Sequence, residues 1–142
     1  MNIEIEQEPS KADTDQLSQG IMAFNDDSIR ELEPVDAEKR FFVMARDDDG
    51  ALQGGIRASC YWNTLHIELL WLSTHSRGSG IGRRLMGKAE AFARENDCEI
   101  ALVETTSWQA KPFYEKNGYR LLATLDGRPK GHSTHYLSKS LI

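Results

Sequence analysis

The chain has 142 residues, an apolar fraction of 39% and a formal net charge of −5 at pH 7. This length predicts one domain, residues 1–142, with a core of its own, and the negative balance argues against broad binding to nucleic acid or anionic membranes. No apolar run approaches the roughly 20 residues of a membrane span, and no signal peptide is recognisable. We therefore expect a cytoplasmic protein in which Cys60 and Cys98 remain thiols.

The first quarter of the chain predicts a strand followed by a helical region. Isoleucine and glutamate alternate over residues 2–7, which is the period of a half-exposed strand. Residues 11–32 carry apolar side chains at helical spacing, and residues 25–28 interrupt that pattern. Ser28 is predicted to cap a short second turn at the interruption.

Three strands joined by tight turns are predicted next. The turn at residues 47–50 ends in Asp-Gly, the sequence signal of a β-hairpin. Gly54 and Gly55 lie within the middle strand and predict a bulge or a close approach of the neighbouring backbone. The three strands are expected at residues 40–46, 51–61 and 65–73.

A glycine-rich run follows the third of these strands. Residues 77–82 read RGSGIG, and apolar residues then recur at helical spacing with charged residues between them. Glycines let backbone N–H groups approach an anion, and a helix N-terminus adds partial positive charge. The order of strand, glycine loop and helix therefore predicts a site for a phosphate-bearing cofactor, to which Arg77, Arg83 and Arg84 add positive charge.

Two common phosphate-binding loops do not match this run. A Walker loop ends in Gly-Lys-Ser/Thr, whereas this loop ends in Gly-Arg-Arg. A dinucleotide fingerprint needs G-x-G-x-x-G, and residues 78–82 read G-x-G-x-G. A third pattern, R-x-x-G-x-G, is satisfied by Arg77, Gly80 and Gly82. With this pattern the segment resembles the acyl-CoA pyrophosphate loop of the GNAT superfamily, the GCN5-related N-acetyltransferases.

A second motif downstream extends the resemblance. Residues 110–119, AKPFYEKNGY, look like the GNAT signature A-x-x-F-Y-x-x-x-G-F/Y. Many family members carry Asn seven residues before the tyrosine, whereas this chain has Ser107, which supplies no amide. A narrower resemblance, to a subset of small bacterial-type GNAT proteins, includes the Pro-x-Gly-His run that ends at His132 and a lysine near the C-terminus, Lys139.

The resemblance implies an α+β, sandwich-like fold. In that fold a mixed, mostly antiparallel sheet of six or seven strands is flanked by helices on both sides. The last third of the chain agrees, because its patterns predict strands at residues 99–106, 119–125 and 135–141 and a short helix at 109–116.

The resemblance also implies a reaction, the transfer of an acetyl group from acetyl-CoA, as cosubstrate, to a primary amine. Such a transfer needs a deprotonated amine, a carbonyl polarised by backbone N–H groups and a proton for the leaving thiolate. By the resemblance Tyr114 is the general acid, although a tyrosine that only packs the core is the alternative. Backbone N–H groups from about Leu72 to Thr74 would polarise the carbonyl. The cofactor is expected to contact Leu72, Ser73, Thr74, Arg77, Gly78, Ser79, Gly80, Ile81, Gly82, Arg83, Ser107, Gln109 and Phe113.

The general base is open between several residues. Glu68 lies on a strand where bases of the family are often found, and a structural salt bridge is an equal alternative for it. Strict alternation would place Glu68 on one face with His66, Leu70 and Leu72. His75 and His132 are alternative bases, because imidazole is suited to proton transfer near neutral pH.

Two rival functions remain open. One is a non-catalytic acyl-CoA-binding or regulatory module of the same fold, which the departure at Ser107 and the undecided base keep in consideration. The other is a nucleotide-binding Rossmann protein. No His, Cys, Asp or Glu cluster has metal-ligand spacing, so no metal is predicted. Expected partners are acetyl-CoA, an amine acceptor and a second copy in a homodimer, and the acceptor is open between a polyamine, an amino acid, an antibiotic and a protein terminus.

Overall fold

The structure is a computed structural model that describes all 142 residues. The chain divides into two compact units, residues 1–36 and 37–142. The first unit contains α1 (Lys11–Ser28), and the Ser10 hydroxyl caps its first turn by accepting a hydrogen bond from the Asp13 backbone N–H at 3.1 Å. No helix of the structure combines the length and the apolar character needed to cross a membrane.

Two predictions for the first unit are wrong. Residues 2–7 form no strand and belong to no ladder of the sheet. Alternation alone cannot make a strand, because the backbone N–H and C=O groups also need a neighbour that satisfies them. Residues 25–28 continue α1 instead of interrupting it. Ser28 ends the helix, and its hydroxyl donates to the Phe24 carbonyl oxygen at 2.8 Å.

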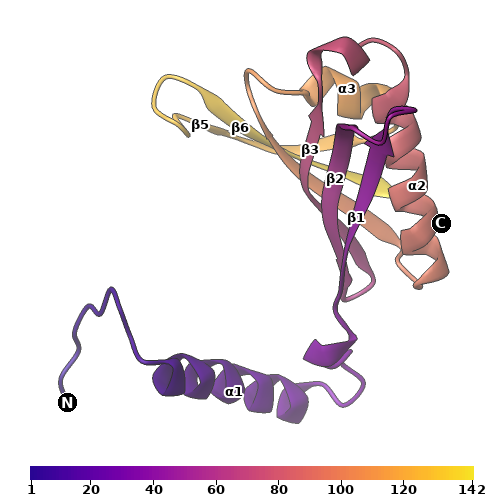
Figure 1. The fold of residues 1–142 in the computed structure, drawn as a ribbon. Coiled ribbons are helices and arrows are strands. Elements are labelled where there is room, and N and C mark those ends of the chain that lie inside the picture. The colour runs from indigo at the N-terminus through magenta and orange to yellow at the C-terminus, as the bar shows by residue number, and fades with distance from the viewer. The chain divides into compact units, whose positions relative to one another are not determined.

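The second unit is built on a six-stranded sheet, which confirms the predicted α+β class. The strand order is β1-β2-β3-β4-β6-β5, and only β3 and β4 run parallel (Figure 1). The strands are β1 (Lys39–Arg46), β2 (Leu52–Tyr61), β3 (Thr64–Leu72), β4 (Ile100–Thr106), β5 (Arg120–Asp126) and β6 (Ser133–Ser140). Predicted and observed ends differ most at the last strand, which begins at Ser133 instead of 135.

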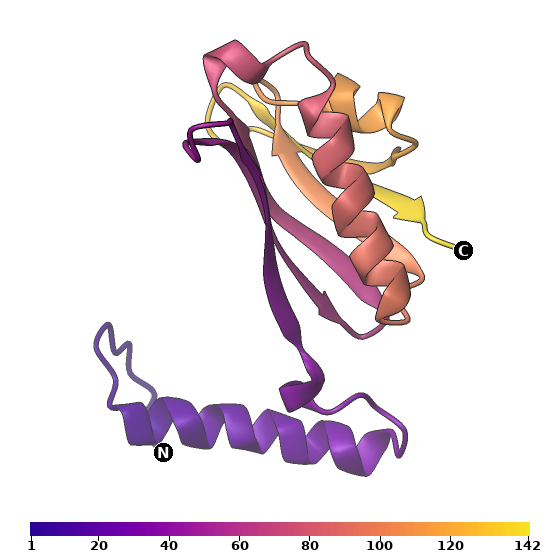
Figure 2. The same cartoon turned by 45° about the vertical axis from the view of Figure 1, so that its right-hand side comes forward.

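Two helices of this unit lie on one face of the sheet (Figure 2). α2 (Ile81–Glu95) begins within the glycine-rich run, at Ile81, and packs against β1, β2 and β3. α3 (Lys111–Lys116) is short, contacts β5 and accommodates its proline in the first turn. Two 3-10 turns complete the elements, η1 (Val35–Ala37) and η2 (Thr74–Ser76).

Gly54 and Gly55 permit the close backbone approach that the sequence predicts for β2. A Cβ on Gly54 would lie 2.8 Å from the Trp71 carbonyl oxygen, and one on Gly55 would lie 2.9 Å from the Val43 carbonyl oxygen. A side chain at either position would clash with the backbone of a neighbouring strand, so only glycine fits there.

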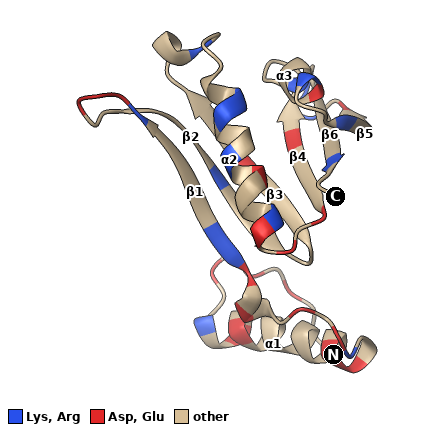
Figure 3. Ribbon diagram, turned by 90° about the vertical axis from the view of Figure 1, so that its right-hand side faces the viewer, with Lys and Arg blue, Asp and Glu red and all other residues tan.

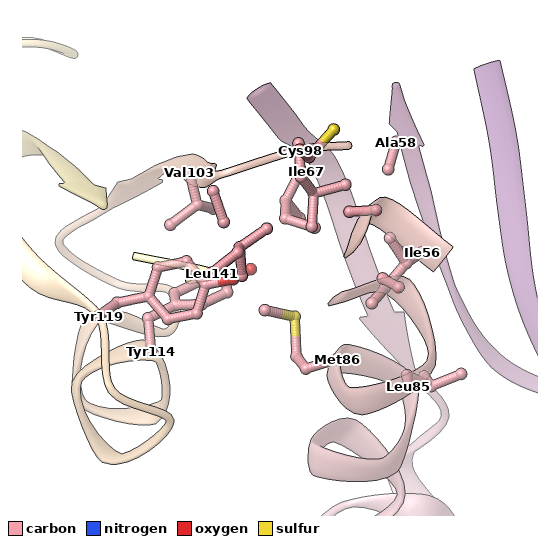
Figure 4. Close-up of a cluster of buried hydrophobic side chains, with 14 of the residues drawn as sticks. Ile56, Ala58, Ile67, Leu85, Met86, Cys98, Val103, Tyr114, Tyr119 and Leu141 are labelled. Atoms are coloured by element: carbon pink, nitrogen blue, oxygen red, sulfur yellow. The ribbon is translucent and has the colours of Figure 1, made fainter. Parts of the chain in front are cut away.

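The core lies between the sheet and the two helices. Its largest fully buried apolar side chains are Ile56, Leu65, Ile67, Met86 and Leu137. Figure 4 shows the rings of Tyr114 and Tyr119 side by side at one end of this core, with their centroids 5.7 Å apart. Residues of α3 and of the segment after it thus belong to the same core as α2.

A buried ion pair ties α2 to β6. Glu90 is 5% exposed, and it accepts hydrogen bonds from Lys139 Nζ at 2.8 Å and from the Tyr119 hydroxyl at 3.1 Å. Burial, followed by the charge of Glu90, raises the pKa of Tyr119. The phenol therefore stays a donor, and the network links the helix of the glycine loop to the segment that follows α3.

Candidate active site

The parallel strands β3 and β4 separate at their C-terminal ends. Their ladder ends at the aligned pair Ile67 and Val103. Beyond this pair, the backbone N–H and C=O groups that face the gap have no strand partner. The sheet is therefore open between residues 68–72 of β3 and 104–106 of β4.

Glu68 occupies a β-bulge at the start of this gap. It is the one residue in this part of β3 that has no aligned partner in β2. Leu70 and Leu72 pack against the core, whereas Glu68 lies on the opposite face, where its Oε2 accepts a hydrogen bond from Arg57 Nε at 2.7 Å. The prediction that Glu68 shares a face with Leu70 and Leu72 is wrong, because the bulge breaks the alternation.

The gap holds a small pocket of about 160 Å³. Its wall contains two carboxylates and one phenol, from Glu68 of β3, Glu104 of β4 and Tyr114 of α3. Its other lining residues are Ile67, Leu69, Leu70, Val103, Thr105, Gln109 and Ala110. Glu68 and Tyr114 were predicted from the sequence, and Glu104 was missed. The sequence signal that could have found Glu104 is the alternation in β4. It places the Glu104 side chain on the opposite face of the sheet from the buried residues on either side of it.

Tyr114 is held as a neutral phenol at this pocket. It is 4% exposed, and its hydroxyl has no hydrogen-bond partner within the protein. Burial raises its pKa to about 12, so the phenol keeps its proton at pH 7. Phe113 and Tyr119 meet the ring edge-on, with centroids at 5.2 and 5.7 Å. A fixed, protonated hydroxyl at a polar pocket can donate a proton or a hydrogen bond to whatever enters.

An arginine holds each carboxylate of the pocket through one oxygen. Arg57 Nε donates to Glu68 Oε2 at 2.7 Å, and Arg128 Nη1 donates to Glu104 Oε1. Arg128 is anchored in turn, because its carbonyl oxygen accepts from the Thr134 hydroxyl at 2.7 Å. The other oxygens, Glu68 Oε1 and Glu104 Oε2, have no partner in the protein.

The glycine loop leads directly into α2. Gly78 and Gly80 have φ angles of 75° and 82°, a region that side chains with a Cβ rarely adopt. Gly80 is the N-cap of α2, and no side chain caps the helix. The first N–H groups of α2 are therefore open to a ligand. A Cβ on Gly80 would meet nothing within 4 Å, so there is free space beside it.

Gly82 allows the start of α2 to pack closely against the rest of the site. A Cβ at this position would lie 3.0 Å from Phe113 Cε1 and 3.3 Å from Leu72 Cδ1. Such distances are tighter than ordinary van der Waals contact. The first turn of α2 thus touches both β3 and α3.

A larger pocket of about 440 Å³ adjoins the small one. It brings together four residues that the sequence predicted for the cofactor, Leu72, Arg77, Gln109 and Phe113. Its other lining residues are Leu70, Trp71, Trp108 and Ala110. Both pockets share Leu70, Gln109 and Ala110, so they form adjoining parts of one site. The two tryptophans were not predicted; each is about half exposed, and only the folded chain brings them to one pocket.

Two predicted cofactor contacts are engaged within the protein. The Ser73 N–H donates to the Gln53 carbonyl oxygen at 2.8 Å, so this N–H is not available to polarise a substrate carbonyl. Ser107 Oγ lies 3.3 Å from His132 Nδ1, and the Ser107 N–H donates to the Ser133 carbonyl oxygen at 2.9 Å. Ser107 therefore joins the end of β4 to the loop before β6.

The remaining predicted residues lie around the loop or away from the pockets. Thr74, Gly78, Ser79, Gly80, Ile81, Gly82 and Arg83 follow one another through η2, the glycine loop and the first turn of α2. His75 and His132 line neither of the two adjoining pockets. Among the candidate bases, only Glu68 lies in the pocket of Tyr114. No group of three or more His, Cys, Asp or Glu is arranged to hold a metal ion.

Basic side chains recur along α2 (Figure 3). Arg84 and Lys88 line a third hollow of about 310 Å³ together with Arg46 of β1. Arg77 and Arg83 flank the glycine loop. In a chain of net charge −5, these residues concentrate positive charge beside the open helix N-terminus and favour an anionic ligand there.

Comparisons with known proteins show which family and which solved structures the chain is similar to. Residues 4–119 match the sequence profile of the acetyltransferase (GNAT) family. The chain is 37% identical over 128 residues to a blasticidin-S acetyltransferase from Streptomyces morookaense, with 89% of this chain and 92% of that protein covered. An acetyltransferase from Bacillus cereus superposes with a TM-score of 0.82 at 26% identity, with 96% of this chain and 97% of that chain covered.

A further solved structure shares the fold. A Bacillus anthracis protein assigned as a streptothricin acetyltransferase was solved in complex with acetyl coenzyme A. It superposes with a TM-score of 0.64 at 23% identity, with 71% of this chain and 62% of that chain covered.

Proposed function

Because the chain belongs to the acetyltransferase (GNAT) family, we propose that it transfers the acetyl group of acetyl-CoA directly to a primary amine, with Tyr114 as the general acid. Family membership supports acetyl-CoA-dependent N-acetyltransferase activity. Our proposal concerns the acceptor and the roles of individual residues. The observation that carries the proposal is the neutral, unpartnered phenol of Tyr114 in the gap between β3 and β4.

Acetyl-CoA is proposed to bind through the glycine loop and the larger pocket. The open N–H groups at the start of α2 and the guanidinium of Arg77 suit a pyrophosphate. The larger pocket is lined mainly by apolar and aromatic side chains, which suits the uncharged pantetheine arm. Its shared wall with the small pocket would bring the thioester toward Tyr114.

The proposed chemistry balances in one displacement. The amine nitrogen attacks the acetyl carbonyl carbon, a C–N bond forms and the C–S bond breaks. The thiolate of CoA takes the phenolic proton of Tyr114, and the tyrosinate regains a proton from solvent. The proton that the amine loses passes to a carboxylate and then to solvent. The products are an N-acetyl amide and CoA.

Glu68 is proposed as the carboxylate that accepts the amine proton. It lies in the same pocket as Tyr114, and its Oε1 is free while Arg57 holds its Oε2. Glu68 faces away from the core because it follows the buried Ile67, and the bulge after it returns Leu70 to the core side.

Blasticidin S is the first acceptor that we propose for this chain. The Streptomyces relative is a blasticidin-S acetyltransferase, and the similarity to it extends over nearly all of both chains. Two carboxylates in the pocket suit an amine that arrives protonated.

The test measures CoA thiol release from acetyl-CoA with a panel of four amines: blasticidin S, spermidine, lysine and a short peptide with a free N-terminus. We expect turnover with blasticidin S, and mass spectrometry should find one added acetyl group on the amine. Turnover with another panel member would replace the proposed acceptor. Acetyl-CoA binding without turnover on any amine would favour the non-catalytic acyl-CoA-binding module instead.

A further inference from the structure

We propose that Glu104 is a second acceptor-binding carboxylate, which faces Glu68 across the gap and holds the acceptor amine as an ammonium before it is deprotonated. This inference rests on the proposed function and adds a residue that the sequence motifs do not contain. Arg128 acts as a positioning residue, because it orients Glu104 without lining the pocket.

The sheet register places the two glutamates opposite each other. Ile67 and Val103 are the last aligned pair of β3 and β4, and Glu68 and Glu104 follow them directly. In β4 the buried residues Val103 and Thr105 flank Glu104, so its side chain lies on the other face of the sheet. Glu68 follows the buried Ile67 and therefore lies on that face as well, beside Arg57. Both carboxylates therefore border the same opening from the same side.

Each glutamate keeps one oxygen for a ligand. Arg57 and Arg128 each engage one oxygen, which leaves Glu68 Oε1 and Glu104 Oε2 without protein partners. A primary ammonium has three N–H donors, and charge-assisted hydrogen bonds to carboxylates are the strong kind. An ammonium that contacted both free oxygens would still have one N–H for a third neighbour.

Tyr114 is the independent sign that this pocket takes a ligand. It approaches from the helix side, it is 4% exposed, and its hydroxyl is unpartnered although it borders the pocket. Thr106 Oγ1 is the one fully buried side-chain oxygen or nitrogen without a partner, so the Tyr114 hydroxyl is accessible to a ligand from the pocket. The arrangement therefore has carboxylates where an amine would enter and a proton donor where a thiolate would leave.

The decisive experiment compares Glu104→Gln with Glu99→Gln. Glu99 immediately precedes β4 at the end remote from the gap, where its Oε2 accepts a hydrogen bond from Asn63. Steady-state kinetics are measured on every amine of the panel that the wild type acetylates. Loss of a hydrogen bond to a charged group predicts a KM for the amine raised by about 10- to 100-fold in Glu104→Gln. Its kcat and its affinity for acetyl-CoA should change much less, and Glu99→Gln should match the wild type.

A second variant separates binding from support of the fold. Arg128→Gln keeps the Glu104 carboxylate but removes its anchor, so we expect a smaller rise in KM than in Glu104→Gln. Equal effects of the two variants, or an unchanged KM in Glu104→Gln, would mean that Glu104 and Arg128 form only a structural ion pair. That result would overturn this inference and leave the proposed function standing. A wild type that acetylates no amine would overturn both.

Discussion

Ile67 of β3 and Val103 of β4 are the last aligned residues of the only parallel ladder in the sheet. The residues proposed for the chemistry lie just beyond this pair. Glu68 and Glu104 follow it on the two strands, and Tyr114 borders the same opening. A parallel pair that opens at one end leaves unpaired backbone groups and room for a ligand beside the core.

Replacing Tyr114 by Phe should lower turnover more than cofactor binding. The ring and its packing against Phe113 and Tyr119 are kept, and only the proton donor is lost. General acid catalysis typically contributes about 10²- to 10⁴-fold, so we expect a fall in kcat of that order. Acetyl-CoA affinity, measured by calorimetry, should stay within about threefold, which is less than 1 kcal/mol. An unchanged kcat would assign Tyr114 to the core alone.

Gly80→Asp should abolish acetyl-CoA binding. A carboxylate beside the open N–H groups of α2 would repel the pyrophosphate, and the φ angle of 82° adds strain for any side chain. Gly80→Ala isolates the strain, and it should weaken binding less than Gly80→Asp. Gly87→Asp is the matched control, because Gly87 lies farther along α2 with open space around it. Binding by Gly80→Asp at wild-type affinity would disprove the role of the loop.

Two glycines of α2 should respond in opposite ways to alanine. A Cβ on Gly87 would meet no atom within 4 Å, so Gly87→Ala should stabilise the helix by about 0.5–1 kcal/mol. Gly82→Ala gains the same helix propensity, but its added Cβ would press on Phe113, which lines the larger pocket. We expect no net gain in stability from Gly82→Ala and weaker acetyl-CoA binding. Urea unfolding and calorimetry on both variants test this, and identical behaviour would contradict it.

The free energy of unfolding should fall at alkaline pH. The phenol of Tyr114 has an ordinary pKa of 10.0, and burial raises the pKa to about 12 in the folded chain. Below pH 10 both states keep the proton, so stability is unaffected. Between pH 10 and 12 only the unfolded chain loses it, which costs about 1.4 kcal/mol per pH unit and about 3 kcal/mol in total. The pKa of Tyr119 is raised by burial and then by Glu90, and it adds in the same direction.

Urea unfolding of the wild type and Tyr114→Phe at pH 9, 10 and 11 measures this contribution. The wild type should lose stability more steeply above pH 10, because the variant lacks one of the two phenols whose pKa is raised by folding. Parallel curves for the two proteins would show that Tyr114 does not carry the raised pKa.

Lys139→Met should destabilise the second unit, residues 37–142, strongly. It removes the ammonium that lies 2.8 Å from Glu90 Oε1 and leaves a carboxylate that is 5% exposed. Breaking a buried pair on one side costs about 3–5 kcal/mol. Glu90 keeps the hydrogen bond from Tyr119 and an ion pair with Arg94 at 3.9 Å, so we expect a loss at the low end of this range. Lys111→Met is the control, since its pair with Glu115 lies on the surface, where such pairs contribute at most about 1 kcal/mol. Equal losses in urea unfolding would contradict the buried network.

The sequence by itself determined the features that depend on neighbouring residues. The α2 helix and its glycine loop follow from apolar spacing and from glycines that tolerate positive φ. Apolar runs bounded by turn residues located the six strands. The family resemblance indicated Arg77, Gln109, Phe113 and Tyr114, which the fold brings to adjoining pockets.

Tertiary structure decided what depends on partners distant in sequence. Alternation at residues 2–7 looked like a strand, but no neighbouring strand pairs with it. The bulge that turns Glu68 away from Leu70 exists only as a register shift against β2. Glu104 becomes a site residue only because β3 and β4 part after Ile67 and Val103. Hydrogen bonds between strands are set by which backbones meet, and no local spacing rule contains that information.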